Sequence, residues 1–340
     1  MRYRLSQAVR GSATQRKVHS VPFIHLAKFT HPLNPTDRCR PMFHYSMIAL
    51  IALFAAVVTA IAWLILRRAT ETTKGAWSMS IAIGYAVGHA GLIALGNLPA
   101  DTVSADAAMA LLDLLPAGFL GILMPQSQLD CLPLAVLLAG VVSANSALFE
   151  QHKPITIAGA VLISCWLVLQ LVGGFGSITV DSTIRLLAGI VALVLCWLSL
   201  QASIQGKSRK IWMGCVAILS VTAVSVLAIT GQTTLAALGA ILLAAMTGGL
   251  LASLLRSAGT DNIRYSGAVI SCSSIGLLLV ACWISSMPWY PVAILVIGYV
   301  AVNSWLPEFI RAPKQRISIT VGCSIVALAV SLLVRFGVIA

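Results

Sequence analysis

Two ionisable side chains, His89 and Asp113, fall inside otherwise apolar runs of this chain. Charge is costly in hydrocarbon, so an ionisable residue inside a membrane-spanning segment is a candidate functional site. Tyr85 lies one helical turn before His89 and shares a helix face with it. A neutral imidazole there can carry a proton or hold a polar group of a substrate. The alternative is an interior histidine bonded to a carbonyl or hydroxyl, with Tyr85 linking two helices.

Asp113 is followed by Pro116 within one helical turn. An unpaired carboxylate in lipid would be neutralised, so Asp113 is expected to face protein or water. Pro116 removes one backbone hydrogen bond and can break the helix, and carriers often build cation or proton sites at such breaks. The alternative places Asp113 at the membrane surface. The predicted substrate or proton pathway comprises His89, Asp113, Tyr85 and Pro116, and contact between His89 and Asp113 is a hypothesis only.

Composition identifies the elements that must position these residues. The 340 residues are 59% hydrophobic and 9% charged, whereas soluble proteins average roughly 25% charged. A spanning helix needs about 20 apolar residues, and a helix satisfies its own backbone in lipid. The chain is therefore predicted to be an all-α, polytopic integral membrane bundle of ten to eleven transmembrane helices. The expected spans are about 46–66, 76–98, 106–124, 131–149, 154–172, 181–206, 211–229, 234–255, 265–285, 289–307 and 317–338.

The N-terminal segment 1–41 differs from the rest because it is basic and has no long apolar run. It carries eight Lys or Arg residues against Asp37 alone. It is predicted to be a disordered extension, either a cytosolic arm or a transit-peptide-like segment. The alternative is that translation begins at Met42 or Met47 and that 1–41 reflects a gene-start error. Residues 42–340 are predicted to form a single transmembrane domain.

Positive charge in short loops sets the orientation of a membrane protein. When all eleven spans cross, four basic loops lie on the same side of the membrane. Their basic residues are Lys153, Lys207, Arg209, Lys210, Arg256, Arg264, Arg311, Lys314 and Arg316. The first loop, with Arg67, Arg68 and Lys74, then falls on the wrong side. If segment 106–124 is re-entrant and does not cross, ten crossings remain and every basic loop is cytoplasmic. Ten crossings are slightly favoured over eleven.

Small residues recur every four positions in segment 234–255, at Ala236, Ala240, Ala244, Gly248 and Ala252. Such a seam favours close helix packing, within the chain or in a dimer, and packing within the chain is favoured. Gly84 and Gly88 form a similar small-residue pair beside His89. Six tryptophans near expected span ends are predicted to be interfacial anchors: Trp63, Trp77, Trp212, Trp283, Trp289 and Trp305.

The sequence carries no nucleotide-binding, metalloprotease, nucleophile-elbow or metal-binding motif, and no cofactor is implied. Its basic loops follow the ordinary membrane pattern, which argues against nucleic-acid binding. The favoured function is a proton- or cation-coupled secondary transporter in the cytoplasmic (inner) membrane. A non-catalytic membrane subunit or scaffold is nearly as well supported, and an intramembrane lipid-acting enzyme is the third alternative. The expected partners are the lipid bilayer and, for the scaffold, other membrane subunits, while oligomeric state is not predicted.

Overall fold

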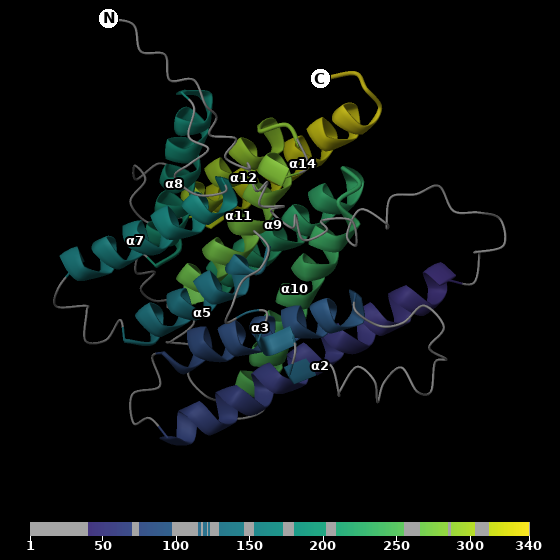
Figure 1. Cartoon of the computed structure of the whole chain (residues 1–340). Coiled ribbons are helices and arrows are strands. Elements are labelled where there is room, and N and C mark those ends of the chain that lie inside the picture. The colour runs from purple at the N-terminus through teal and green to yellow at the C-terminus, as the bar shows by residue number, and fades with distance from the viewer. Residues whose placement is uncertain are drawn as a thin grey trace, which may run out of the picture. The chain divides into compact units, whose positions relative to one another are not determined.

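The computed structural model describes residues 40–69, 75–96, 115–116, 118–120, 122, 129–145, 153–172, 180–201, 209–254, 266–284, 287–302 and 313–339. Within these ranges the regular structure is entirely helical, as predicted. The helices are α2 (Arg40–Ala69), α3 (Ala76–Gly96), α5 (Cys131–Ala144), α7 (Lys153–Val172), α8 (Val180–Gln201), α9 (Arg209–Ile229), α10 (Thr233–Leu254), α11 (Gly267–Ile284), α12 (Tyr290–Ala301) and α14 (Pro313–Arg335) (Figure 1). Segment 1–39, most of the predicted N-terminal extension, lies outside the described residues.

Six of these helices are long and apolar enough to cross a membrane, namely α2, α3, α8, α9, α10 and α14. The apolar stretches of α5, α7, α11 and α12 are shorter within the described residues. The prediction of an all-helical integral membrane protein therefore fits the structure. Length and composition identify six membrane-crossing helices among the described residues, so the predicted total of ten to eleven crossings is not confirmed.

Two helix boundaries differ from the predicted spans. Helix α2 begins at Arg40 rather than at position 46, with Pro41 in its first turn, where proline is well tolerated. The apolar run marks only the part of a helix that matches the bilayer, so a helix can extend beyond it. Helix α5 ends at Ala144, before the predicted position 149. The Asn145 side chain donates a hydrogen bond of 2.9 Å to the Val141 carbonyl and so competes with the helical backbone pattern.

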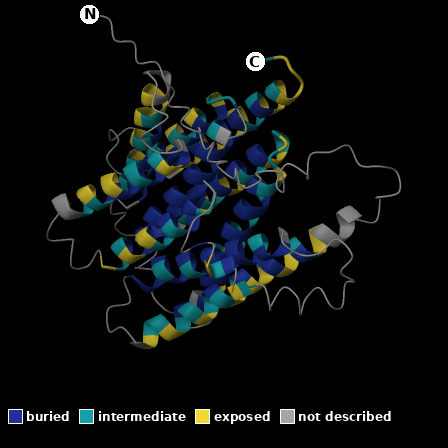
Figure 2. Cartoon of the chain, viewed as in Figure 1, coloured by how far each residue is buried: buried dark blue, intermediate teal, exposed yellow. Residues whose placement is uncertain are grey.

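Helix α11 forms the centre of the bundle. Every residue from Ser266 to Cys282 is buried, and the helix contacts α3, α5, α7, α8, α9, α10 and α12. Figure 2 shows this buried centre in dark blue. A helix that is apolar on all sides must be covered by other helices or by lipid, and α11 is covered by protein.

Outer helices instead expose apolar side chains. Only 22% of the apolar stretch of α2 and 22% of that of α14 is buried. Figure 2 shows exposed positions in yellow along the outer edge of α2. Its exposed large apolar residues recur at intervals of three and four: Leu50, Leu53, Phe54, Val57, Ile61 and Ile65. A soluble protein rarely leaves so long an apolar stripe uncovered. These faces are suited to contact with lipid chains.

The α10 seam packs against α2 within the same chain. A β-carbon added at Gly248 would overlap the backbone carbonyl of Ala56. The Gly84–Gly88 pair works in the same way, since a β-carbon at Gly84 would overlap the Thr59 hydroxyl of α2. Both predictions of close helix approach are confirmed, and the seam is used in intramolecular packing.

Contacts between helices fix the directions of α2, α3, α5 and α10. Trp63 meets Trp77 at a ring-centroid distance of 6.5 Å, so the end of α2 lies at the start of α3. Trp77 also packs on Gly249, near the end of α10. Gly75, just before α3, packs on Ala144 at the end of α5. Helix α3 is therefore antiparallel to α2, α5 and α10.

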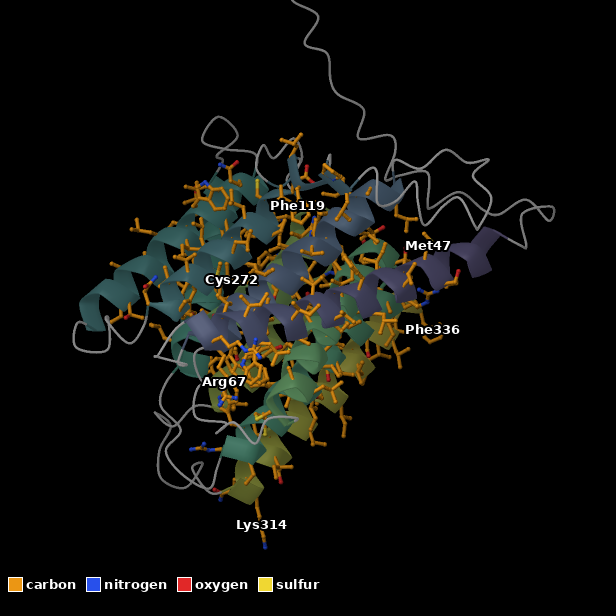
Figure 3. All side chains as sticks on the ribbon, turned by 90° about the horizontal axis from the view of Figure 1, so that it is seen from below. Met47, Arg67, Phe119, Cys272, Lys314 and Phe336 are labelled. Carbon is orange, nitrogen blue, oxygen red and sulfur yellow. The ribbon has the colours of Figure 1, made fainter. Side chains whose placement is uncertain are left out.

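At the opposite end of the bundle, Arg335 donates a hydrogen bond of 2.7 Å to the Ile229 carbonyl, so α14 ends where α9 ends. The Thr230 hydroxyl lies 3.5 Å from Met287 Sδ, which brings together the α9–α10 and α11–α12 connections. Figure 3 shows the same polarity, with Arg67 and Lys314 toward one end and Met47 and Phe336 toward the other.

The remaining two helices follow the same alternation. Gly189, in the first half of α8, packs on Trp283 at the end of α11. Gly159, near the start of α7, packs on Val142 at the end of α5. Helix α8 therefore begins where α11 ends, and α7 begins where α5 ends.

The predicted role of the tryptophans as interfacial anchors is wrong for three of them. Trp63, Trp77 and Trp212 are 2%, 3% and 4% exposed, so they pack between helices instead of facing lipid. Trp283 and Trp289 are partly buried and pack edge to face at 5.5 Å. The sequence locates a tryptophan along a helix, but the face on which it lies depends on which neighbours the helix acquires.

Candidate functional site

His89 and Tyr85 lie together in the interior of the bundle, as their spacing predicts. Both side chains are 0% exposed. Their ring centroids are 5.9 Å apart, and the rings meet edge to face at 68°. Small residues make this position possible, because Gly88 admits Ile241 of α10 and Ala55 of α2 against the same stretch of α3. The pair is therefore enclosed by neighbouring helices.

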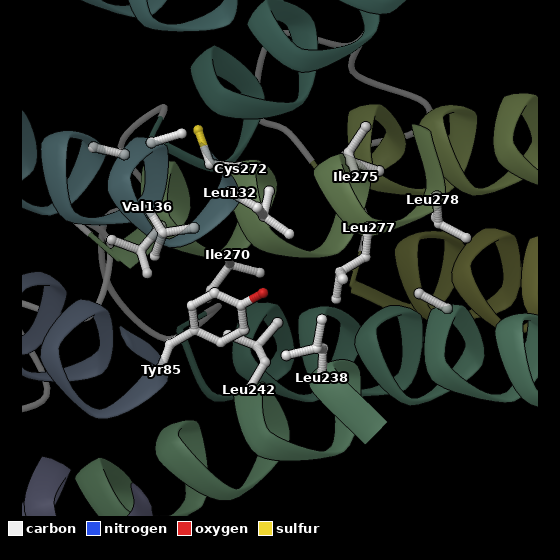
Figure 4. Close-up of a cluster of buried hydrophobic side chains, with 14 of the residues drawn as sticks. Tyr85, Leu132, Val136, Leu238, Leu242, Ile270, Cys272, Ile275, Leu277 and Leu278 are labelled. Carbon is white, nitrogen blue, oxygen red and sulfur yellow. The ribbon is translucent and has the colours of Figure 1, made fainter. Parts of the chain in front are cut away.

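Apolar side chains surround Tyr85. Figure 4 shows its ring inside a buried cluster supplied by α5, α10 and α11, whose members include Leu132, Val136, Leu238, Leu242, Ile270 and Leu277. A phenol in such surroundings has no water to accept its proton. Its hydroxyl must therefore find a protein partner or remain unpaired.

Neither side chain has a hydrogen-bond partner among the described residues. The Tyr85 hydroxyl and both ring nitrogens of His89, Nδ1 and Nε2, are buried and unpaired. No described carbonyl or hydroxyl therefore makes the bond to His89 that the alternative interpretation expects. A buried polar group without a partner costs about 1–3 kcal/mol. It is unusual for three such polar atoms without described partners to lie on one face of a helix.

Part of the segment predicted at 106–124 packs against α3 close to this pair. Gly118 lies against the backbone carbonyl of Ala90, where an added β-carbon would lie 2.5 Å from the oxygen. Ile122 and the partly buried Phe119 form a small apolar cluster with Ala86 and Ala90. The segment that carries two of the predicted site residues thus contacts the residue next to His89.

The four predicted pathway residues have different outcomes. The structure brings Tyr85 and His89 together. Pro116 is helical and exposed. Asp113 lies outside the described residues, so its contact with His89 stays a prediction.

A second group of buried polar side chains was not predicted from the sequence. Tyr299 of α12 shares a hydrogen bond of 3.1 Å with Ser220 of α9, and both residues are buried. Ser274 of α11 faces the same phenol. Tyrosine and serine are unremarkable in an apolar helix, so only the convergence of three helices reveals the group. Unlike Tyr85, Tyr299 has its hydroxyl satisfied by protein.

No protein-family model, no curated protein and no solved structure matches this chain. Any functional conclusion therefore depends on the site itself. Neutral imidazole offers one donor and one acceptor, and the phenol adds a hydroxyl that can do either. Together they can bind a small polar group or pass a proton between two oxygen or nitrogen atoms. Within the described residues no group of three His, Cys, Asp or Glu side chains is placed to hold a metal ion.

Proposed function

We propose that this chain is a secondary transporter in the cytoplasmic (inner) membrane, coupled to protons or cations, with ten crossings and a re-entrant segment between α3 and α5. The observation that carries the proposal is the fully buried pair of Tyr85 and His89, whose polar atoms have no hydrogen-bond partner among the residues that the structure describes. Intramembrane polar groups of this kind mark ion and substrate pathways. The unmet hydrogen-bonding capacity is the feature that a proton or a substrate group would use.

The ten-crossing arrangement is supported by helix direction. Helices α3 and α5 are antiparallel, because Gly75 meets Ala144 and Gly140 meets Ala82. A full crossing between them would make α3 and α5 parallel. The chain between Gly96 and Cys131 therefore leaves and returns at the same end of the bundle. Re-entrant segments are tolerated at membrane depth where protein covers them, and Gly118, Phe119 and Ile122 pack on α3.

Charge distribution agrees with this arrangement. Under this topology, the helix ends and connections on one side of the membrane carry, in the sequence, twelve of the fourteen Lys and Arg residues after position 41: Arg67, Arg68, Lys74, Lys153, Lys207, Arg209, Lys210, Arg256, Arg264, Arg311, Lys314 and Arg316. The other side then carries only two basic residues, Arg185 and Arg335, together with five aspartates: Asp101, Asp106, Asp113, Asp130 and Asp181. The basic end is the cytoplasmic end by the positive-inside rule. With this topology, no basic loop lies on the side that the positive-inside rule disfavours.

Cysteine labelling tests this topology. In intact cells, a cysteine introduced as Thr70→Cys should resist a membrane-impermeant maleimide, and Thr102→Cys should react with it. Eleven crossings with an internal N-terminus give the reverse pattern. A variant without the native cysteines provides the background for both measurements.

Proton coupling is tested in proteoliposomes that contain a pH-sensitive dye. Pools of small solutes are added outside, and a transported solute should drive proton movement. His89→Leu and Asp113→Asn should each abolish the signal without loss of protein. Tyr299→Phe is the matched control, because it removes a buried hydroxyl outside the proposed pathway and should leave coupling intact. Coupled movement that persists in Asp113→Asn would rule out the role of that carboxylate.

A membrane scaffold is the second candidate, favoured by the large exposed apolar faces of α2 and α14. Helices of another subunit could cover those faces as well as lipid does. A scaffold predicts that a fixed partner co-purifies in mild detergent and that His89→Leu leaves the complex intact. A transporter predicts solute movement by the purified chain alone.

A further inference from the structure

A stacked group of side chains lies where α2 ends and α3 begins. The guanidinium carbon of Arg67 is 5.2 Å from the centre of the Trp63 ring, an arrangement that attracts the cation to the aromatic face. Trp63 in turn meets Trp77 edge to face at 6.5 Å. Trp63 and Trp77 are almost fully buried, so the stack has a fixed position.

A third helix holds this stack in place. Trp77 packs on Gly249 of α10, where an added β-carbon would lie 3.0 Å from Trp77 Cζ3. Thr59 of α2 packs on the same glycine. The position of the Trp63 ring, on which the Arg67 guanidinium stacks, is therefore set by α2, α3 and α10 together, and a ligand would not have to order that ring.

The polar atoms of this stack can only donate hydrogen bonds. Trp63 Nε1 and Arg67 Nη1 are both buried, and neither has an acceptor among the described residues. An indole N–H and a guanidinium carry no lone pair for a donor to use. Arg68, the next residue, is exposed and adds a second positive charge. Within the described part of the chain this group has two buried donors without an acceptor and two positively charged side chains.

We propose that Arg67, with Trp63 and Arg68, binds a phosphate group, that of an anionic lipid headgroup. The group lies at the end of long apolar helices, at the level where headgroups meet a spanning helix. A planar guanidinium matches phosphate oxygens with two parallel hydrogen bonds, and basic sites between helices at the cytoplasmic side recognise such lipids. Free phosphate offers the same chemistry from a second source. The proposal is independent of transport.

Lipid titration of the purified full chain in detergent tests the proposal. Phosphatidylglycerol should raise the unfolding temperature and remain bound in native mass spectra, whereas phosphatidylcholine should do neither. Inorganic phosphate at millimolar concentration should have no effect. Arg67→Gln should weaken phosphatidylglycerol binding about tenfold, because it removes a charge-assisted contact. Trp63→Phe keeps an aromatic ring for the guanidinium but removes the N–H and one of the two fused rings, and it should weaken binding by a smaller factor.

Lys314→Gln is the matched control, since it removes one exposed positive charge from the same end outside this group. It should leave phosphatidylglycerol affinity unchanged. If Arg67→Gln does not fold, Arg67→Lys replaces it, and the loss of the planar fork should still weaken binding. Equal affinity in the wild type and the Arg67 variants overturns the proposal, as does an equal loss in Lys314→Gln. Stabilisation by inorganic phosphate that depends on Arg67 would overturn the lipid as the source of the phosphate.

Discussion

Two buried tyrosines allow the same chemical change to be tested in opposite situations. Tyr85 and Tyr299 are both 0% exposed. The Tyr85 hydroxyl has no partner among the described residues, whereas the Tyr299 hydroxyl shares a 3.1 Å hydrogen bond with Ser220. Tyr→Phe removes one oxygen from each and leaves the ring in place. The two variants should therefore change stability in opposite directions.

The expected magnitudes follow from these contacts. In Tyr299→Phe the Ser220 hydroxyl loses its partner in a buried site, which should lower the free energy of unfolding by about 1–3 kcal/mol. In Tyr85→Phe an unpaired buried hydroxyl disappears, which should raise the free energy of unfolding by a similar amount, again about 1–3 kcal/mol. The two variants should thus differ by at least about 2 kcal/mol, well above the usual error of such measurements.

Reversible unfolding in mixed micelles, or thermal unfolding in one detergent, measures this difference. The wild type and both variants are compared at the same protein and detergent concentrations. If Tyr85→Phe destabilises the protein as much as Tyr299→Phe does, the Tyr85 hydroxyl has a partner within the chain. That result would refute the idea that the Tyr85–His89 pair offers unused hydrogen-bonding capacity to a proton or a ligand.

Two further predictions concern helix packing and helix ends. Gly248→Ala should lower the free energy of unfolding by about 1–3 kcal/mol, because its β-carbon would overlap the Ala56 carbonyl. Gly214→Ala is the control, since nothing lies within 4 Å of its added β-carbon, and equal effects in thermal unfolding would contradict close packing of α10 on α2. Arg335→Gln should remove the cap on the Ile229 carbonyl and speed amide hydrogen exchange at the end of α9, and unchanged exchange would show that the contact contributes nothing.

One part of the candidate site, the proximity of Tyr85 and His89, could be predicted from the sequence because it depends on positions along one helix. The spacing of Tyr85 and His89 places them on one face, and the structure brings their rings to 5.9 Å. The Tyr299–Ser220 bond joins α12 to α9, and no periodicity within either helix indicates which distant residue it meets. The unpaired state of His89 is likewise a property of its neighbours and not of its own segment.

The sequence by itself determined the class of the protein and the close packing of its small-residue seams. Long uncharged runs are costly in water and favourable in lipid, and small residues at every fourth position permit close helix contact whatever the partner. Only the tertiary structure decided which helix packs against each small-residue seam and which tryptophans are buried. It also decided that α3 and α5 run antiparallel to each other. Those features depend on contacts between residues far apart in the chain, such as Gly75 with Ala144 and Gly248 with Ala56. Hydropathy is a local property and carries no information about such pairs.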